Sequence, residues 1–505
     1  KISSGSHFDS KILCGRIRAM QLRDLKKVHL IGIKGTGMSG LALALAKLGI
    51  KVTGSDATDS FLLLDSADFR RASVTIYEQF DATNVPEDAN AIIASSSHLT
   101  KNVEINKARK LKIPVLTYAD VVGMLSEEFK SIAVCGSHGK TTTTNLLAHV
   151  LASSKLPMLA LAGPTSEQVL SELWVKSLPF GKPFRSATAR ERDAFPAGND
   201  GVFSEGHMAS PLFVFEADEY QNKLKQYSPF GVILTNIELD HPDYFKTKES
   251  YRKVFEQFVK RIPKEGFLIY CADDADCRAV AAKAKCHTFS YGFSEGADYL
   301  IRAVQHADHG TPFALHHEGK AIGIFRSALM GQHNVLNAAA VVLASRELGI
   351  DEQRIQAGLL SFRGSPRRLE KISEDPLVYD DYGHHPTEIK ATLHALRSTF
   401  QDKKIVAVFH PHTYSRTKKF LKEFGASFTD ADHVIVLDIF ESREVGKQTI
   451  SSKDVVTEIQ KHGIKAEYAP TFEDAAKLLK GKLNDKTLLL TIGAGDVWKI
   501  HKLIT

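Results

Sequence analysis

The chain has 505 residues, which is too long for one ordinary domain and predicts roughly two to four domains. Its apolar share of 43% and charged share of 25% are ordinary for a globular protein, and a formal charge of +6 without runs of lysine or arginine argues against a nucleic-acid partner. Five cysteines without CxxC spacing argue against a disulfide framework and a structural zinc, and they favour a reducing cytosol.

The first block of the chain carries the pattern of a βαβ unit. Its expected elements are a strand at residues 28–33, a helix at 41–50, a strand at 51–56 and a later strand at 91–97. A glycine-rich turn opens the helix, and Asp56 follows the second strand where a dinucleotide fold binds ribose. This pattern predicts a Rossmann-like domain over residues 1–127 that binds a diphosphate. An oxidoreductase is the competing interpretation, although hydride transfer needs neither the second phosphate loop nor the metal site described next.

The second block, residues 128–363, contains the strongest local signal of the sequence. An apolar strand at residues 131–137 leads through Gly136-Ser137-His138-Gly139-Lys140-Thr141 into a helix. Such a turn aims backbone N–H groups and the positive end of the helix at phosphate oxygens. Lys140 can then reach the outer phosphates, and the Thr141 hydroxyl can bind Mg²⁺. Val134 stands at the place of the first glycine of the full phosphate-loop pattern, so an ordinary glycine turn is the alternative.

Two acidic clusters follow strands of the same block. They are Glu216-Ala217-Asp218-Glu219 and Asn236-Ile237-Glu238-Leu239-Asp240-His241. Hard oxygen ligands beside a phosphate loop predict a magnesium site, whereas solvated strand ends are the alternative for each cluster alone. The stretch at residues 177–210 is rich in Pro, Gly and charge, and we expect a surface insertion without chemistry.

The third block, residues 364–505, repeats apolar runs that end in polar residues. Asp380-Asp381-Tyr382-Gly383-His384-His385-Pro386 places two acids and two imidazoles at one strand end, which we interpret as substrate positioning, with a solvated turn or a zinc site as alternatives. His410, His412 and Arg416 follow the next strand. One of Arg367 and Arg368 is expected to clamp a transferring phosphoryl group, and the other to be a surface arginine. The whole pattern predicts an α/β protein of three domains with mostly parallel sheets.

Seven motifs in order resemble those of the Mur ligase family, over about residues 28–496. They are IGIKGTGMSGLA, GSHGKTTTT, EADE, TNIELDH, GQHNVLNAAAV, SPRRLE and DDYGHHPTEI. The resemblance implies a Rossmann-like UDP-binding domain, a central P-loop-type ATPase domain and a C-terminal Rossmann-like domain that receives the amino acid.

The resemblance also implies roles for individual residues. Contacts to the UDP-sugar would come from Gly35, Thr36, Gly37, Met38, Ser39, Asp56, Ser96, His138 and Arg416. Contacts to ATP would come from Gly136, Ser137, His138, Gly139, Lys140, Thr141, Thr142, His333, Asn334, Asn337, Arg368 and Asp381. Mg²⁺ would be held by Thr141, Glu216 and His241. The catalytic residues would be Lys140, Arg368, Asp381, His384 and His385.

The implied reaction is the ATP-dependent ligation of L-alanine to the carboxylate of UDP-N-acetylmuramate through an acyl phosphate, in peptidoglycan precursor synthesis. Lys34, Tyr220 and Thr413 depart from the alanine-adding pattern. Tyr220 is shared with the relatives that recycle muramyl tripeptide, which are the alternative, and a non-catalytic nucleotide-binding scaffold is the alternative of another class. No segment is apolar enough for a signal peptide or a membrane helix, so we expect a cytoplasmic monomer or dimer without a membrane partner.

Overall fold

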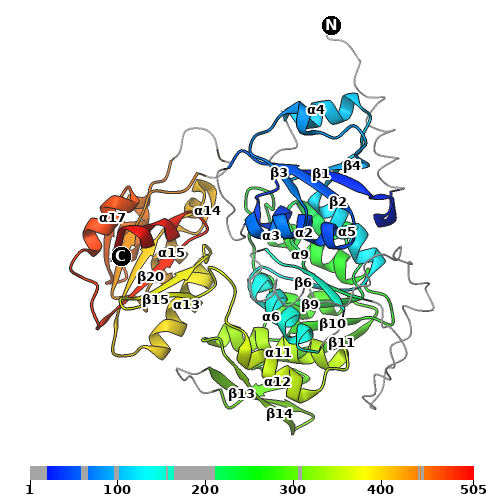
Figure 1. Cartoon of the computed structure of the whole chain (residues 1–505). Coiled ribbons are helices and arrows are strands. Elements are labelled where there is room, and N and C mark those ends of the chain that lie inside the picture. Colours follow the sequence, from blue (N-terminus) through cyan, green and yellow to red (C-terminus); the bar gives the residue numbers. More distant parts are fainter. Residues whose placement is uncertain are drawn as a thin grey trace.

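The computed structural model describes residues 20–58, 66–95, 102–154, 157–163, 211–304, 310–441, 444 and 449–504. Three α/β domains follow one another along the chain, each built on its own sheet (Figure 1), and this confirms the expected fold class. The three sheets fall within residues 1–127, 128–363 and 364–505, respectively. The expected insertion at 177–210 and Ser96 lie outside the described residues.

The first domain holds a five-stranded parallel sheet of order β3-β2-β1-β4-β5. Its strands are β1 (Lys27–Ile31), β2 (Lys51–Ser55), β3 (Thr75–Tyr77), β4 (Ala91–Ala94) and β5 (Val115–Thr117). Its helices are η1 (Leu22–Asp24), α2 (Thr36–Lys47), α3 (Ser66–Arg71), η2 (Ala82–Asn84), α4 (Val103–Lys110) and α5 (Tyr118–Glu128). Strands β2 and β3 are added on one side of β1, and β4 and β5 on the other. Open parallel sheets bind ligands at such a switch point in strand order, here between β1 and β4.

The middle domain holds a nine-stranded sheet of order β14-β13-β12-β11-β10-β9-β6-β8-β7. Its strands are β6 (Lys130–Cys135), β7 (Met158–Leu161), β8 (Leu212–Glu216), β9 (Gly231–Leu234), β10 (Phe267–Cys271), β11 (His287–Gly292), β12 (Tyr299–Arg302), β13 (Thr311–His317) and β14 (Lys320–Ser327). Its helices are α6 (Lys140–Ala152), η3 (Tyr220–Gln226), α9 (Lys248–Val259), α10 (Ala275–Ala281), α11 (Gln332–Glu347) and α12 (Glu352–Ser361). Strands β13 and β14 are antiparallel additions at one edge, and α6 packs against α11 and α12.

The third domain holds a six-stranded sheet of order β15-β16-β20-β17-β18-β19, parallel except for the edge strand β15. Its strands are β15 (Glu370–Glu374), β16 (Leu377–Asp381), β17 (Lys404–Phe409), β18 (His433–Val436), β19 (Lys465–Tyr468) and β20 (Thr487–Ile492). Its helices are α13 (Pro386–Thr399), α14 (Tyr414–Lys419), α15 (Leu421–Ser427), α16 (Ser452–Gln460), α17 (Phe472–Leu479), η4 (Val497–Ile500) and α18 (His501–Ile504).

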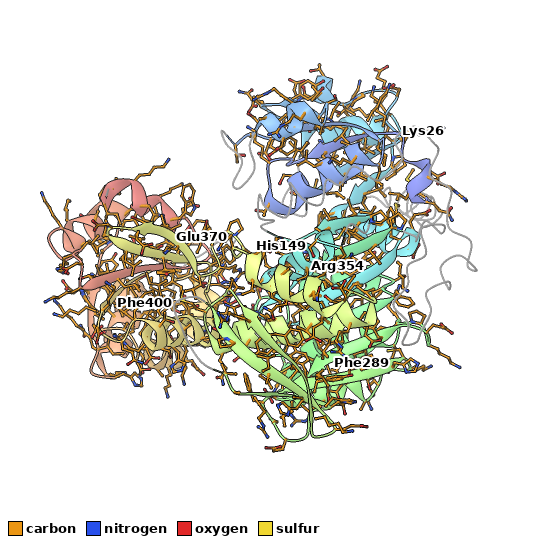
Figure 2. All side chains as sticks on the ribbon, turned by 60° about the horizontal axis from the view of Figure 1, so that its bottom comes forward. Lys26, His149, Phe289, Arg354, Glu370 and Phe400 are labelled. Carbon is orange, nitrogen blue, oxygen red and sulfur yellow. The ribbon has the colours of Figure 1, made fainter. Side chains whose placement is uncertain are left out.

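The middle domain joins its two neighbours in different ways. Leu41 of α2 and Leu161 of β7 belong to one continuous buried apolar cluster, so the first and middle domains share a core. The third domain has separate apolar clusters of its own. Figure 2 shows it, labelled at Glu370 and Phe400, beside the middle domain. Among the described residues no helix combines the length and the apolar character needed to cross a bilayer.

Candidate active site

The turn after β6 is held in a fixed shape by the segment that follows β9. Gly136 has a φ of 131° and lies so close to Thr235 that a Cβ atom would approach the threonine Oγ1 to 2.2 Å. The N–H of Ser137 donates to the Asn236 carbonyl at 2.9 Å, and the N–H of His138 donates to the Asn236 Oδ1 at 2.9 Å. Gly139 has a φ of 81° at the N-cap of α6. The predicted phosphate loop is therefore a rigid turn that only glycine fits at two positions.

Lys140 lies beneath this loop and is paired with a buried acid. Its Nζ donates to the carbonyls of Gly136 at 2.6 Å and Ser137 at 3.0 Å, and to Glu219 Oε2 at 3.1 Å. Burial by itself would raise the pKa of Glu219, but Lys140 and His241 outweigh it and hold this pKa below its usual range. Burial opposes the charge of Lys140 in the same way, yet Glu219 raises the pKa of the lysine, so the pair is ionised.

Oxygen donors gather next to the first turn of α6. The Thr141 hydroxyl donates to Glu216 Oε2 at 2.9 Å, and the Gly163 N–H donates to the same oxygen at 2.7 Å. His241 Nε2 lies 3.5 Å from Glu219 Oε1, and one ligand atom each of Asp218, Glu219 and His241 lies within 4.8 Å of the others. Carboxylate and hydroxyl oxygens form the donor set that Mg²⁺ prefers, so Thr141 and Glu216 fit the predicted ion, whereas the third predicted ligand, His241, groups with Asp218 and Glu219.

A cavity of about 540 Å³ opens between the middle and third domains. Its lining includes predicted nucleotide-binding residues from both domains, namely His138, Gly139, Thr141, Thr142, His333, Asn334, Asn337, Arg368 and Asp381. Gly136, Ser137 and Lys140 are not part of this lining. Asn337 lies against the loop, because a Cβ atom on Gly139 would approach its Oδ1 to 2.7 Å. Burial lowers the pKa of His333 to about 4, so this imidazole is neutral. It can donate a hydrogen bond from one ring nitrogen and accept one at the other.

The two adjacent arginines of the third domain have different environments. Arg367 is not a surface residue, which corrects the expectation for one of the pair. Its guanidinium donates to Asp380 Oδ2 at 2.8 Å and to the carbonyls of Gly493 at 2.7 Å and Gly495 at 3.0 Å, so it holds the end of the sheet together. Arg368 lines the cavity instead, with its guanidinium 5.0 Å from the centre of the Tyr382 ring.

Asp381 also faces the cavity, with both oxygens engaged by backbone groups. Its carboxylate accepts the N–H of Leu369 at 2.7 Å and the N–H of Gly383 at 2.7 Å. Burial raises the pKa of Asp381 to about 6, against the lowering influence of Arg368. The carboxyl group is therefore ionised at neutral pH but takes up a proton at higher pH than an ordinary aspartate.

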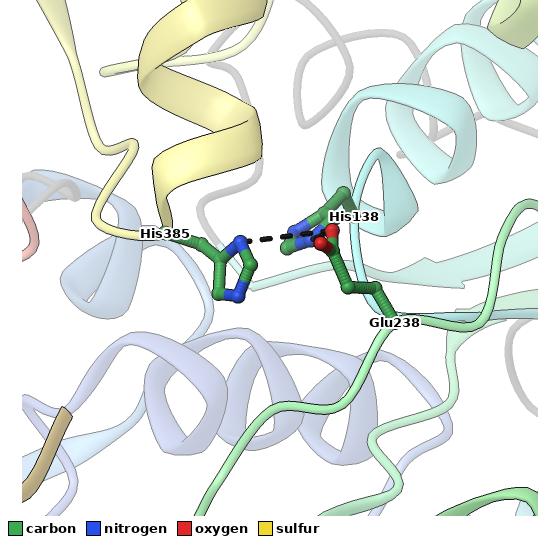
Figure 3. A group of neighbouring side chains, drawn as sticks. All are labelled: His138, Glu238 and His385. Atoms are coloured by element: carbon green, nitrogen blue, oxygen red, sulfur yellow. Dashed lines mark hydrogen bonds and ion pairs between the residues drawn. The ribbon is translucent and has the colours of Figure 1, made fainter. Parts of the chain in front are cut away.

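A group of side chains crosses from the middle domain to the third beside the cavity (Figure 3). His138 Nε2 lies 3.0 Å from Glu238 Oε2, and His385 Nδ1 lies 3.6 Å from the same oxygen. Burial would lower the pKa of His138, but Glu388 and Glu238 outweigh it and raise this pKa to about 9. The ligand atoms of His138, Glu238 and His385 lie within 4.8 Å of one another, a spacing that a metal ion can also use. Because His138 already carries a proton between two carboxylates, we interpret the group as a polar clasp between domains.

The two neighbouring imidazoles of the third domain are held neutral. Burial, followed by the positive charge of Arg416, lowers the pKa of His384 well below its usual range. Burial and the charge of His138 lower the pKa of His385. His385 is almost fully buried at the N-terminus of α13, whereas His384 is partly exposed.

The remaining predicted residues lie away from the cavity. In the first domain, Gly35 to Ser39 form the start of α2. Asp56 accepts the Lys34 N–H at 2.9 Å and the Thr58 N–H at 3.0 Å, so the ribose-binding candidate supports the glycine-rich turn here. The departing residue Lys34 is buried and donates from Nζ to the Thr58 carbonyl at 2.5 Å. Arg416 of the third domain donates to Asp240 Oδ1 of the middle domain at 2.7 Å.

Sequence reasoning missed two acids of this site, Glu238 as a contact and Glu388 altogether. Glu238 of the middle domain accepts a hydrogen bond from the Thr387 hydroxyl of the third domain at 2.8 Å. Glu388 of the third domain forms an ion pair with His138 of the middle domain, with 3.2 Å between Oε1 and Nδ1. The signal for Glu388 was its place three residues after His385, the spacing of a capping box. No comparable local signal identifies a contact between residues so far apart in sequence.

A rigid glycine turn before a helix, converging oxygen donors and an arginine supplied by another domain define a multidomain α/β protein with the features of a nucleotide-binding enzyme. Three family models match the chain in order: the Mur ligase family catalytic domain at residues 27–130, the Mur ligase middle domain at 134–345 and the Mur ligase glutamate ligase domain at 367–495. The chain belongs to the Mur ligase family.

Similar proteins cover nearly the whole chain. A UDP-N-acetylmuramate–L-alanine ligase of Desulfitobacterium hafniense is 35% identical over 477 residues, 94% of this chain and 98% of its own. The structure of the UDP-N-acetylmuramate–alanine ligase of Thermotoga maritima superposes with a TM-score of 0.71 at 24% identity and covers 95% of this chain and 98% of its own. A murein peptide ligase of Psychrobacter arcticus superposes with a TM-score of 0.65 at 23% identity and covers the same shares. The two structures establish the common fold.

Proposed function

We propose that the protein is an ATP-dependent ligase that joins L-alanine to the carboxylate of UDP-N-acetylmuramate, in the synthesis of peptidoglycan precursors. The observation that carries the proposal is the 35% identity to a relative of that name over 94% of the chain, through all three domains. The geometry of the site supplies the groups that such a reaction needs.

ATP would lie in the cavity between the middle and third domains. Its phosphates would rest on the turn at residues 136–139, and His333, Asn334 and Asn337 would contact the base, the ribose or the phosphates. Mg²⁺ would be held by Thr141, Glu216 and His241, where it would neutralise phosphate charge. The UDP-sugar would be held by Gly35, Thr36, Gly37, Met38, Ser39, Asp56 and Ser96 of the first domain, with His138 and Arg416.

The first chemical step would convert the sugar carboxylate into an acyl phosphate. A carboxylate is a poor electrophile, and transfer of the γ-phosphoryl group from ATP gives it a good leaving group. Lys140 and Arg368 are the cations that we assign to this event, because Lys140 donates to carbonyl groups of the loop and Arg368 lines the cavity. Both would neutralise charge on the transferring group.

The second step would be attack by the amine of alanine, followed by release of phosphate. The amine must lose a proton, and a neutral imidazole is a suitable base. His384 or His385 would hold the amine or take up its proton. His384 is partly exposed and therefore more accessible than the buried His385, whereas its strongly lowered pKa makes it a weak base. Asp381 would contact substrate or nucleotide from the same edge of the sheet.

The test of this proposal is phosphate release from ATP, measured with UDP-N-acetylmuramate and each of L-alanine, L-serine and glycine. We expect release that depends on both substrates, with L-alanine preferred. When the muramyl carboxylate carries ¹⁸O, one label should appear in the phosphate, because the acyl phosphate retains it. Release without a sugar acceptor, or unlabelled phosphate, would contradict the proposal, and ATP binding without any turnover would favour a non-catalytic scaffold.

A second candidate is the ligation of muramyl tripeptide, which one observation favours. Tyr220 follows the acidic motif, and its hydroxyl donates to Asp243 at 2.7 Å while its ring centre lies 4.7 Å from that of His241. The same assay with the tripeptide L-alanyl-γ-D-glutamyl-meso-diaminopimelate separates the two. Higher kcat/KM for the tripeptide than for L-alanine would select this candidate.

A further inference from the structure

Glu388 is a largely buried acid at the third position of α13, and it contacts residues of the middle domain. Its Oε2 accepts the backbone N–H of His384 at 3.0 Å and that of His385 at 3.2 Å. Its Oε1 lies 3.2 Å from His138 Nδ1 and 3.7 Å from Arg368 Nη1. One carboxylate oxygen therefore serves its own helix, while the other contacts the phosphate loop and the cavity arginine.

The second set of contacts exceeds what a helix cap requires. In a capping box the acid at the third helical position accepts the N-cap N–H, which needs only one of its two oxygens. Only 13% of the Glu388 side chain is exposed, and 13% of His138. A buried carboxylate is costly unless cations compensate it. The charge of His138 is the main reason why the pKa of Glu388 lies well below its usual range despite burial, and Arg368 adds to this effect.

Carboxylates from both domains that meet at the cavity contact the imidazole of His138. Glu238 of the middle domain contacts its Nε2, Glu388 of the third domain contacts its Nδ1, and the ring centre of His385 lies 4.9 Å away. With an acceptor at each nitrogen, the imidazole donates from both only in its charged form. The charged loop histidine thus connects the domain that binds phosphate to the domain that carries Arg368.

We propose that Glu388 is a positioning residue of the ligase reaction, which holds the phosphate-loop residue His138 and the third-domain residue Arg368 in one closed arrangement around the triphosphate. This inference rests on the proposed function for its turnover readout. It assigns Glu388 no contact with substrate. Its effect passes through the two cations that it orients.

The decisive variant is Glu388→Gln, since the amide keeps a carbonyl for the two N–H groups of the cap and loses the charge. We expect kcat to fall about 10²-fold, because small misplacements of reacting groups have costs of that size. KM for the UDP-sugar should change less than kcat, because most contacts to that substrate would come from the first domain and only His138 among them is oriented by Glu388. Asp454→Asn is the matched control, an exposed capping-box acid of α16 in the same domain, and it should leave kcat unchanged.

The pH profile separates positioning from a merely structural role. Glu388 and Glu238 hold the pKa of His138 at about 9. The imidazole therefore stays charged below that pH, and its contacts with the two carboxylates are lost as the pH rises above it. Without the Glu388 charge this pKa falls, and the alkaline fall in kcat of Glu388→Gln should begin at lower pH than in the wild type. Glu388→Asp, which keeps the charge, should restore part of the kcat and the wild-type profile.

The pair His138→Asn and Glu388→Gln forms a double-mutant cycle. If the two residues act as a unit, the double variant should be no slower than the slower single variant. Additive losses, a uniformly lowered pH profile without a shift, or a kcat within about threefold of the wild type would each overturn the proposal.

Binding of a non-hydrolysable ATP analogue with Mg²⁺ gives a readout that does not depend on ligation. A charge-assisted contact of this kind corresponds to about tenfold or more in affinity, so Glu388→Gln should bind the analogue about tenfold less tightly at pH 8. If the wild type ligates neither L-alanine nor the tripeptide, the proposed function fails, and the affinity for the ATP analogue alone then tests the role of Glu388. Equal affinity in the wild type and the variant would then overturn the role of Glu388.

Discussion

Lys140 tests the chemistry of the site at the scale of one residue. Lys140→Ala removes the cation beneath the phosphate loop and leaves the buried Glu219 without its nearest counter-charge. Loss of one group that stabilises developing charge typically lowers kcat by about 10²–10³-fold, and we expect a loss of at least that size in phosphate release. Lys260→Ala, at an exposed position after α9, is the matched control and should retain wild-type kcat. Substantial ligation by Lys140→Ala would remove this residue from the mechanism.

Arg367 shows how far a single buried ion pair can matter for stability. Asp380 is 1% exposed, and its contacts are Arg367 and the Thr491 hydroxyl. Arg367→Ala should lower the free energy of unfolding by about 3–5 kcal/mol, because it leaves a buried charge without compensation. Chemical denaturation measures this change. Arg354→Ala, which breaks the exposed pair with Asp351, should cost less than about 1 kcal/mol, and equal effects of the two variants would contradict the assignment of Arg367.

The turn between β6 and α6 gives a test at the scale of the element. Gly139 combines a φ of +81° with a position where a Cβ atom would meet Asn337 Oδ1 at 2.7 Å. Gly139→Ala should therefore add a steric clash to the backbone cost of about 1–2 kcal/mol, displace the loop and raise KM for ATP. Gly463 has a similar φ of +77° but open space around it, so Gly463→Ala isolates the backbone cost and should leave KM for ATP unchanged. The same KM for both variants would contradict a packed loop.

The elements that the sequence predicted correctly are those with a strong local pattern. Apolar runs such as 131–137 became buried parallel strands, because a sheet covered on both faces needs continuous apolar sequence. The turn at residues 136–139 was predictable because its glycines meet a local backbone requirement, with positive φ at Gly136 and Gly139. The antiparallel edge strands β13 and β14 carry no comparable pattern and were not predicted.

The parts of the site that the sequence did not reveal depend on contacts between domains. Arg367 and Arg368 are adjacent and chemically identical, yet one is buried beside Asp380 and the other faces the cavity, since neighbouring side chains point in different directions. Glu388 could be recognised as a helix cap, but its contact with His138 joins residues 250 positions apart through the packing of two domains. No local propensity encodes such a pairing.

At the scale of the molecule, the two domain boundaries differ in their chemistry. The first and middle domains share a continuous apolar cluster. The third domain has its own clusters, against which Met330 of the middle domain packs, and it also meets the middle domain through polar contacts around the cavity. Among the described residues, these contacts include His138 with Glu388, Glu238 with Thr387 and Asp240 with Arg416. An apolar core resists separation, while polar contacts can exchange with water, so the third domain is the part we expect to open for ATP entry.

Variants of the ion pair between Arg416 and Asp240 test this domain closure directly. Both side chains are less than a tenth exposed, and the guanidinium contacts the carboxylate at 2.7 Å across the boundary. Truncating one partner of such a buried pair costs about 2–5 kcal/mol, and here the cost falls on the closed arrangement alone, because water can solvate the other partner once the domains separate. Arg416→Gln should therefore increase the radius of gyration in small-angle scattering with ATP analogue and Mg²⁺ present, while the thermal stability of each domain is retained.

Asp240→Asn should open the molecule to a similar extent, and the double variant should open it no further, since both changes remove the same contact. Arg302→Gln, which breaks an exposed ion pair with Glu295 inside the middle domain, provides the control and should leave the scattering curve unchanged. Because opening separates Arg368 from the phosphate loop, kcat should fall in parallel with the increase in radius. A wild-type scattering curve for Arg416→Gln together with a reduced kcat would show that Arg416 acts through its contact with the UDP-sugar alone and not through domain closure.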